Sequence, residues 1–395
     1  MRNLDSHSKT PLKILHVATH TGVSAGGAFE MLNMVSGLKE RGHDVTCVFN
    51  WRDGRTGVGE RNFEPLAEAG IRWETFRMEA FSGWVLGDQR RFRRWVQDEN
   101  FDIVHCHKPR AVRFVLKTLR GLDKPKIVVH RGNSYAIDDN ARRTYGDPQI
   151  GAIICVADEL GNIAIAGGLD ARKIVTIYTG VDTRVFDANL DGNDARRELN
   201  IPESAKVVGL LANFEEKKSH DQFLKVAVAV AREVPDVHFL LVGRGAGDEF
   251  KSQLRVLDLE KNTVLAGFRS DAARMLAAMD VSINVSAHGE GLTGAMRESL
   301  AMRKPVVCTD VGGNREIVRD GETGRLIAPN DVAAFGDAVV ELLRDIEYSK
   351  RLAQNGYNFV MQHFTRDGSL SRLEEIYRAV VEGRALYQNT DNGMQ

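Results

Sequence analysis

The chain has 395 residues, of which 43% are hydrophobic and 27% charged, and its formal net charge is −1. This balance excludes a chain that is disordered throughout, and the length suffices for two domains. Four scattered cysteines without a C-x-x-C pair exclude a disulfide scaffold and a zinc ribbon.

No stretch reaches the roughly 18 apolar residues of a membrane span, and the apolar run at 14–18 is too short for a signal-peptide core. We therefore expect a cytoplasmic protein, at most peripheral at the inner face of a membrane. Residues 1–180 carry a net charge of +5 and the remainder −6, which suggests different tasks for the two halves. The imbalance is too small to indicate nucleic-acid binding.

Short apolar runs alternate with helical spacing in the first half of the chain. We expect strands at 12–19, 45–50, 103–106, 127–130, 153–156 and 174–178, and a first helix at 28–41 that Gly42 ends. Apolar strands separated by helices predict a parallel sheet that is covered on both faces.

Residues 183–203 are polar and interrupt this rhythm, so we expect the domain junction there. A second series follows, with strands at 207–211, 237–242, 263–266, 281–285 and 305–309, helices at 219–233, 248–257, 271–279 and 293–302, and mostly helix over 331–385. The predicted fold class is α/β, with two Rossmann-like doubly wound domains, 1–183 and 184–369, facing a central cleft. Residues 370–395 are expected to form a helix crossing back to the first domain and a frayed tail.

The segment 290–307 follows a strand and opens a helix. The N–H groups and dipole at such a helix end suit a phosphate, and Gly291 allows the backbone to approach a ligand closely. Glu298 lies one to two turns into the helix, where a carboxylate can accept two hydrogen bonds from a ribose diol. Glu290 can reach a sugar hydroxyl. The alternative is two ordinary solvated glutamates.

Lys218 follows a strand and precedes a helix, where its ammonium can meet a diphosphate, although most lysines so placed are only solvated. Gly26 and Gly27 form a loop that a ligand can approach closely, although turns need glycine anyway. The glycines at 243–247 are spaced one residue short of a dinucleotide fingerprint, and no acid follows the next strand, so we exclude NAD.

His107 and His130 end two strands and are expected to face the cleft. His105 and His107 share a face if their strand continues, which could make a metal pair. No carboxylate or third histidine follows nearby, so we predict no metal site; the alternative is one packed and one solvated histidine. No Asp-x-Asp occurs that would hold a divalent ion on a diphosphate.

A basic cluster with interleaved aromatic residues lies at 90–95. On a helix its arginines could meet an anionic membrane surface or an anionic acceptor, with Phe92 and Trp95 as anchors. The alternative is a surface helix whose aromatic side chains pack in the domain core. The candidate contact residues are Arg90, Arg91, Arg93, Arg94 and Trp95, with His107 as an acceptor candidate.

The segment 290–307 resembles the hallmark of the retaining glycosyltransferases of family 4, which have the GT-B fold. That hallmark has two glutamates with seven residues between them, here Glu290 and Glu298. The resemblance covers nearly the whole chain, and further segments similar to the family lie at 26–27, 41–45, 178–182, 311–318 and 320–324.

The resemblance implies that residues 184–369 bind a nucleotide-diphosphate sugar, with a UDP-linked one expected, and that residues 1–183 bind the acceptor. It makes Glu290, Lys218 and His130 the catalytic candidates. It implies no cofactor or metal, because Lys218 and the helix N-terminus would stabilise the leaving diphosphate. The implied donor-binding residues are Gly26, Gly27, Asn213, Arg244, Arg269, Gly291, Leu292, Thr293 and Glu298.

The chain departs from the family pattern at three places. Asn213 stands where the family usually has a diphosphate-binding arginine, and we expect Arg244 to replace it. Leu292 and Thr293 replace the usual Phe-Gly after Gly291, and Ala157 replaces a usual serine. Base contacts in the family are mostly made by the backbone, here near Arg269.

The activity implied is transfer of a sugar, with retention, from a nucleotide sugar to an acceptor hydroxyl in bacterial-type surface glycan or glycolipid synthesis. The expected partners are a nucleotide-sugar donor and a glycan or glycolipid acceptor, with contact to an anionic membrane and no nucleic acid. One alternative is a nucleotide-sugar 2-epimerase of the same fold, against which the family-like opening unit argues. Another is a non-enzymatic two-lobed binding protein, against which the missing signal peptide argues.

Overall fold

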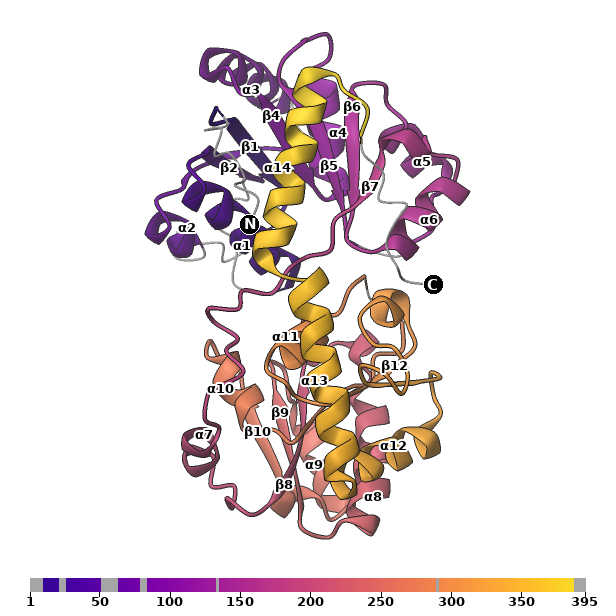
Figure 1. Cartoon of the computed structure of the whole chain (residues 1–395). Helices are drawn as coiled ribbons and strands as arrows, with labels where there is room; N and C mark the ends of the chain where they lie inside the picture. The colour runs from indigo at the N-terminus through magenta and orange to yellow at the C-terminus, as the bar shows by residue number, and fades with distance from the viewer. Residues whose placement is uncertain are drawn as a thin grey trace, which may run out of the picture.

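The computed structural model describes residues 10–20, 26–50, 63–78, 84–132, 135–288 and 291–386. Two α/β domains are stacked end to end, and the last two helices run along one side of both (Figure 1). None of the helices within these ranges is long and apolar enough to span a membrane.

The first domain is built on a seven-stranded parallel sheet. Its strand order is β3(Arg72–Phe76), β2(Asp44–Asn50), β1(Lys13–Ala18), β4(Ile103–His107), β5(Lys126–Arg131), β6(Ile150–Cys155) and β7(Ile174–Thr176). The central strands are buried along almost their whole length, as strands covered by helices on both faces must be. The described helices are α1(Gly26–Glu40), α2(Glu64–Glu68), α3(Trp84–Glu99), α4(Pro109–Thr118), α5(Asp139–Tyr145) and α6(Asp158–Ala166).

The second domain repeats this order in a six-stranded parallel sheet. Its strands run β10(Thr263–Gly267), β9(Val237–Val242), β8(Lys206–Leu211), β11(Val281–Asn284), β12(Val306–Thr309) and β13(Arg325–Ile327). The helices, with α7 in the junction, are α7(Asn193–Glu198), α8(His220–Glu233), α9(Asp248–Val256), α10(Ala272–Ala277), α11(Gly294–Ala301) and α12(Val332–Arg344). The strand order reverses between β1 and β4 and between β8 and β11, and ligands of such sheets bind at these points.

The predicted α/β class with two doubly wound domains is confirmed. Two edge strands, β3 and β13, were missed by the sequence analysis. In β3 the exposed Arg72 and Glu74 interrupt the apolar signal, and β13 has only three residues. An edge strand needs less apolar surface than a central one, so hydrophobic runs alone do not find it.

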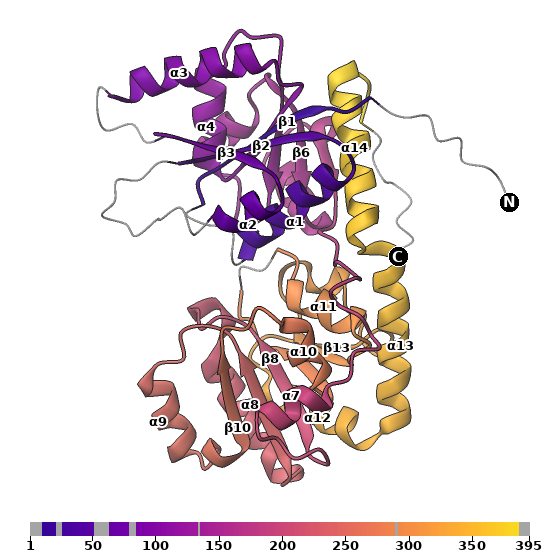
Figure 2. The ribbon, with the colours of Figure 1, turned by 90° about the vertical axis from the view of Figure 1, so that its left-hand side faces the viewer.

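The chain crosses between the domains twice, and the two crossings lie side by side. The N–H of Val181 donates to Phe364 O (2.8 Å), and the N–H of Arg366 donates to Val181 O (2.9 Å). α13(Ile346–His363) packs on α11 and α12, whereas α14(Arg366–Glu382) packs on α1, β5 and β6 (Figure 2). The last helix therefore lies on the first domain.

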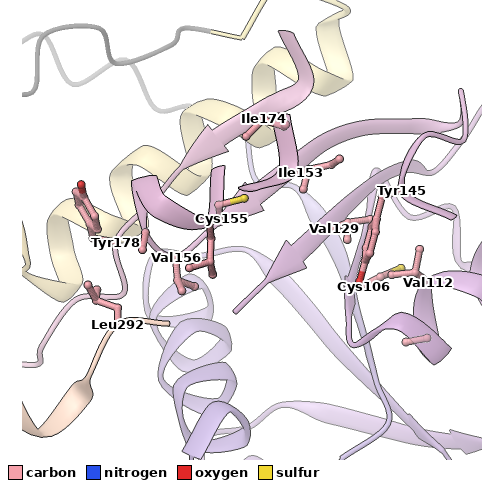
Figure 3. Packing of buried hydrophobic residues seen from close by; sticks show 14 of the residues in the cluster. Cys106, Val112, Val129, Tyr145, Ile153, Cys155, Val156, Ile174, Tyr178 and Leu292 are labelled. Atoms are coloured by element: carbon pink, nitrogen blue, oxygen red, sulfur yellow. The ribbon is translucent and has the colours of Figure 1, made fainter. Parts of the chain in front are cut away.

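Apolar and polar contacts hold the two domains together at the cleft. Leu292 of the second domain belongs to the same buried cluster as Val156 and Tyr178 of the first (Figure 3). The carboxylate of Glu316 accepts hydrogen bonds from the N–H groups of Asp158 (2.7 Å) and Glu159 (2.9 Å), so the second domain caps α6 of the first. The carboxyl ends of both sheets are thereby held against each other.

Candidate active site

The N-terminus of α11 stands at the carboxyl end of β11, facing the first domain. Its first turn holds no acidic residue, and no side chain within the described ranges caps it. The hydroxyl of Thr293 instead donates to Asn314 Oδ1 (2.5 Å), whose amide donates to Thr309 O (2.9 Å). The uncapped N–H groups and the positive dipole end are suited to an anion.

Gly291 marks where the loop before α11 touches the first domain. A Cβ atom on Gly291 would lie 2.8 Å from Gly132 O, so a side chain there would push the domains apart. Its carbonyl accepts a hydrogen bond from the N–H of Gly313 (2.9 Å). Glu290, a catalytic candidate, lies outside the described residues.

Glu298 sits on α11 beside that helix end and is half-buried. Burial raises its pKa to about 7; Arg297 opposes this rise and Glu30 adds to it. Its carboxyl oxygen Oε1 would lie 3.6 Å from a Cβ atom on Gly294, the first residue of the helix. The carboxyl group therefore lies beside the helix N-terminus. Because its pKa is near 7, a ligand that donates a hydrogen bond to it favours the ionised form at neutral pH.

Arg297 is a site residue that the sequence analysis missed. Its side chain is 4% exposed, and Nη2 donates to Glu30 Oε1 (2.9 Å) on α1 across the cleft. The Nε and Nη1 atoms are buried and have no partner within the described residues. Two unpaired guanidinium donors beside the start of α11 favour an anionic or hydroxyl-rich ligand.

Lys218 ends a 3₁₀ turn, Glu216–Lys218, that follows β8 and precedes α8. The N–H of Ala287 donates to Lys217 O (2.9 Å), which joins this turn to the loop after β11. The pKa of neighbouring His220 is lowered to about 4 by burial and by the charge of Lys218. Lys218 and the start of α11 therefore follow adjacent strands at the reversal of the sheet.

The three remaining polar donor candidates already have local partners. The side-chain oxygen of Asn213 accepts from the N–H of Arg244 (3.0 Å), and the Arg244 guanidinium lies 3.9 Å from the centre of the Phe268 ring. Arg269 is ion-paired with Asp271 (2.7 Å) and Glu198 (2.6 Å). The charge of Arg269 is therefore balanced by two carboxylates, and the guanidinium of Arg244 rests on an aromatic ring outside the start of α11.

A cavity of about 100 Å³ lies in the first domain where β1, β4 and β5 end. It brings together three of the residues singled out from the sequence, Gly27, His107 and His130, and no described atom lies within 4 Å of a Cβ placed on Gly27. Gly26 is the first residue of α1 at the same edge. The cavity adds His20, Glu30, Lys108 and Arg131, which the sequence analysis did not select.

His130 is held neutral at this cavity. Burial lowers its pKa to about 4, and the charges of Lys108 and His20 lower it further. A neutral imidazole offers one hydrogen-bond donor and one acceptor, which suits contact with sugar hydroxyls.

The basic helix α3 turns Phe92 and Trp95 towards the domain core rather than towards solvent. Phe92 is fully buried and Trp95 packs against the same apolar cluster, so their interpretation as anchors is wrong. Arg93 donates to Thr118 O (2.8 Å) and Arg120 O (2.9 Å), and Arg91 donates to Thr75 O (3.1 Å). Arg90 and Arg94 are exposed. Over residues 90–95, α3 therefore offers charge to solvent rather than its aromatic rings.

Two doubly wound domains whose carboxyl strand ends meet at a glycine-rich helix start suited to an anion have the architecture of the GT-B fold. The family model described as Glycosyltransferase Family 4 matches residues 26–185, and the model described as Glycosyl transferases group 1 matches residues 205–345. The chain belongs to this family of glycosyltransferases.

The alignments with two curated relatives cover most of this chain and most of each relative. N-acetyl-alpha-D-glucosaminyl L-malate synthase of Bacillus anthracis is 27% identical over 87% of this chain and 91% of its own. Phosphatidyl-myo-inositol mannosyltransferase of Mycobacterium leprae is 29% identical over 74% and 77%.

Solved structures share the fold at lower identity. A glycosyltransferase from Rickettsia africae has a TM-score of 0.84 at 20% identity and covers 95% of this chain and 100% of its own. Anabaena Alr3699/HepE in complex with UDP has a TM-score of 0.79 at 19% identity, with 93% and 100% covered.

Proposed function

We propose that the protein is a retaining glycosyltransferase that takes its sugar from a nucleotide-diphosphate donor, a UDP-linked one, and transfers it to a hydroxyl of a glycan or glycolipid acceptor. The observation that carries this proposal is the uncapped start of α11, flanked by Glu298 and by the unpaired guanidinium donors of Arg297. One curated relative is named a lipopolysaccharide core glycosyltransferase of Rhizobium meliloti, and Anabaena HepE has been solved with UDP-glucose, which supports this substrate class.

The donor's diphosphate would bind at the α11 N-terminus, and its ribose diol would donate hydrogen bonds to Glu298. As the bond between the anomeric carbon and the phosphate oxygen breaks, negative charge grows on the diphosphate. Lys218 and the helix N–H groups stabilise that charge, and this stabilisation is strongest in the transition state. The new carbon–oxygen bond forms on the face from which the diphosphate leaves, and the acceptor's hydroxyl proton passes to the departing phosphate oxygen.

Arg297 completes the diphosphate clamp in this proposal, in place of the arginine that the family usually has at the position of Asn213. It is better suited than Arg244 because its charge is buried at the cleft and two of its donor atoms lack partners among the described residues. With Lys218, Arg297 and the helix end supplying positive charge, the transfer step needs no divalent ion at the diphosphate.

The acceptor would enter the cavity of the first domain, where neutral His130 can contact hydroxyl groups. We also propose peripheral contact with an anionic membrane, made by basic side chains of the first domain and without apolar anchors. Besides exposed Arg90 and Arg94, a groove of about 480 Å³ is lined by four basic residues of α4, α5 and the adjoining loop: Arg113, Lys117, Arg120 and Arg143.

The test is a thermal-shift panel of UDP-, GDP- and ADP-linked sugars, followed by product analysis without an acceptor. We expect a UDP-sugar to raise the Tm of the protein. Without an acceptor, we expect the enzyme to free the nucleotide from that donor only slowly. Glu298→Gln should lose the shift, while Glu347→Gln, a change on the exposed surface of α13, should keep it. Interconversion of the donor sugar would instead identify an epimerase, and no shift with any nucleotide sugar would contradict the proposal.

A further inference from the structure

Four histidines share one face of three neighbouring strands in the first domain. His16 of β1 pairs in register with His105 of β4, and His107 of β4 pairs with His130 of β5. Because residues two apart on a strand point to the same side, the parallel sheet aligns these imidazoles. α14 covers this face, where Tyr377 Oη lies 2.6 Å from His105 Nδ1.

Three of these rings form a compact, buried group. His16, His105 and His107 are each at most 4% exposed. One ring nitrogen from each lies within 4.8 Å of the others, and His16 Nδ1 is 3.0 Å from His107 Nε2. The sequence analysis excluded a metal site because no third ligand stood near His105 and His107. That reason is wrong, because the fold brings in His16 from 91 residues away from His107.

Two ring nitrogens in the group have no partner. His16 Nε2 and His105 Nε2 are buried, and neither has a hydrogen-bond partner among the described residues. Leaving a buried polar atom without a partner is unfavourable, so the two nitrogens favour a bound ligand. On His105 one nitrogen is held by Tyr377 while the other is unpaired, which is the arrangement of a metal-ligating histidine with its outer partner.

The chemistry of the three rings fits one class of ion. Burial lowers the pKa of all three, so they are neutral and able to ligate without first losing a proton. Imidazole nitrogens without carboxylates suit Zn²⁺, Co²⁺, Ni²⁺ and Cu²⁺, and do not suit Mg²⁺ or Ca²⁺.

We propose that His16, His105 and His107 bind a first-row transition-metal ion of the imidazole-preferring class, with a water molecule as the fourth ligand, at a site that ties β1 to β4. Bonds of about 2.1 Å to a tetrahedral ion put ligand nitrogens about 3.4 Å apart. One nitrogen from each ring lies within 4.8 Å of the other two, so the rings need to draw in by at most about 1.4 Å to reach this spacing. His107 also lines the cavity of the first domain, so the metal site adjoins that cavity, and it takes no part in the proposed diphosphate chemistry.

The test uses the full chain, stripped of metal and dialysed against Co²⁺ or Zn²⁺, with Mg²⁺ as the unsuitable ion. We expect one tightly held Co²⁺ or Zn²⁺ per chain, the visible absorption of tetrahedral Co²⁺, a rise in Tm with Zn²⁺, and no retention of Mg²⁺. The absorption needs no variant, so it stays informative even if a substitution impairs folding.

Variants assign the ligands. His16→Gln and His105→Gln should each abolish Co²⁺ retention and the Tm rise. His220→Gln, which changes a buried histidine of the second domain outside the group, should keep both. Wild-type protein without retained Co²⁺ or Zn²⁺, or retention unchanged in the His16 and His105 variants, would overturn the proposal whatever the enzyme's activity proves to be.

Discussion

β4 and β11 hold the same place in their sheets, yet the helices that follow them begin differently. α4 begins at Pro109, which has no N–H, behind Lys108 in a positive-φ conformation, and it opens on a cavity lined by neutral histidines. α11 begins at Gly294 with all its N–H groups, beside Glu298 and Arg297. The repeated topology supplies two equivalent positions, and a few side chains at each helix start decide which one can bind an anion.

The largest effect is expected from Lys218, which follows β8, the strand next to β11. Lys218→Ala should lower kcat by about 100-fold and raise the donor KM much less, because the diphosphate gains charge as the sugar bond breaks. Steady-state kinetics checks this, with Lys217→Ala as the neighbouring control. A change confined to KM would show that Lys218 only binds the ground state.

A second change separates the two candidate clamp arginines. Arg297→Gln should lower kcat/KM about 10-fold or more, because a charged hydrogen bond contributes about 1.5–3 kcal/mol, whereas Arg244→Gln should have little effect. A larger loss of kcat/KM in Arg244→Gln than in Arg297→Gln would identify Arg244 as the arginine that binds the diphosphate. Circular dichroism and Tm of Arg297→Gln must match the wild type, since the change also removes the contact to Glu30.

The pH dependence of donor binding sharpens the assignment of Glu298. In the empty protein its pKa is raised to about 7, so the group is partly protonated at neutral pH. Ribose hydroxyls donate to the ionised form and lower that pKa, so binding should release a proton near pH 7 and weaken as pH falls below 7. The same shift means that the empty protein loses stability as pH rises from about 4.5 towards 7.

Calorimetry in two buffers of different ionisation enthalpy measures that proton. UDP-glucose is the suitable probe, because its diphosphate carries no group that titrates near neutrality. The apparent enthalpy should depend on the buffer for the wild type and not for Glu298→Gln. Buffer-independent binding by the wild type would argue against a ribose contact at Glu298.

The smallest effect concerns the first domain's basic surface. Each basic residue near an anionic membrane contributes roughly 1 kcal/mol, less as salt rises, so binding should be weak and reversible. The protein should sediment with anionic but not neutral vesicles at low salt. Arg90→Glu with Arg94→Glu should reduce this, while Lys251→Glu with Arg255→Glu on α9 should not. No sedimentation of the wild type would favour a soluble acceptor.

Local sequence patterns predicted the strands of both sheets other than β3 and β13, and the helix that begins after β11, since these depend on short runs of residues. They did not predict contacts between distant segments. Arg297 meets Glu30 across 267 residues, and His16 meets His107 across 91. The burial of Phe92 was likewise undecided, because a basic helix with aromatics fits both a membrane surface and a domain edge until its packing partners are known.

The most direct test of the central claim is calorimetric titration of the protein with UDP and with uridine, each in the presence of EDTA. The account predicts that UDP binds, that uridine binds far more weakly, and that EDTA leaves the UDP affinity unchanged, because the α11 N-terminus, Lys218 and Arg297 hold the diphosphate. Equal binding of UDP and uridine, or UDP binding that requires added Mg²⁺ or Mn²⁺, would contradict it.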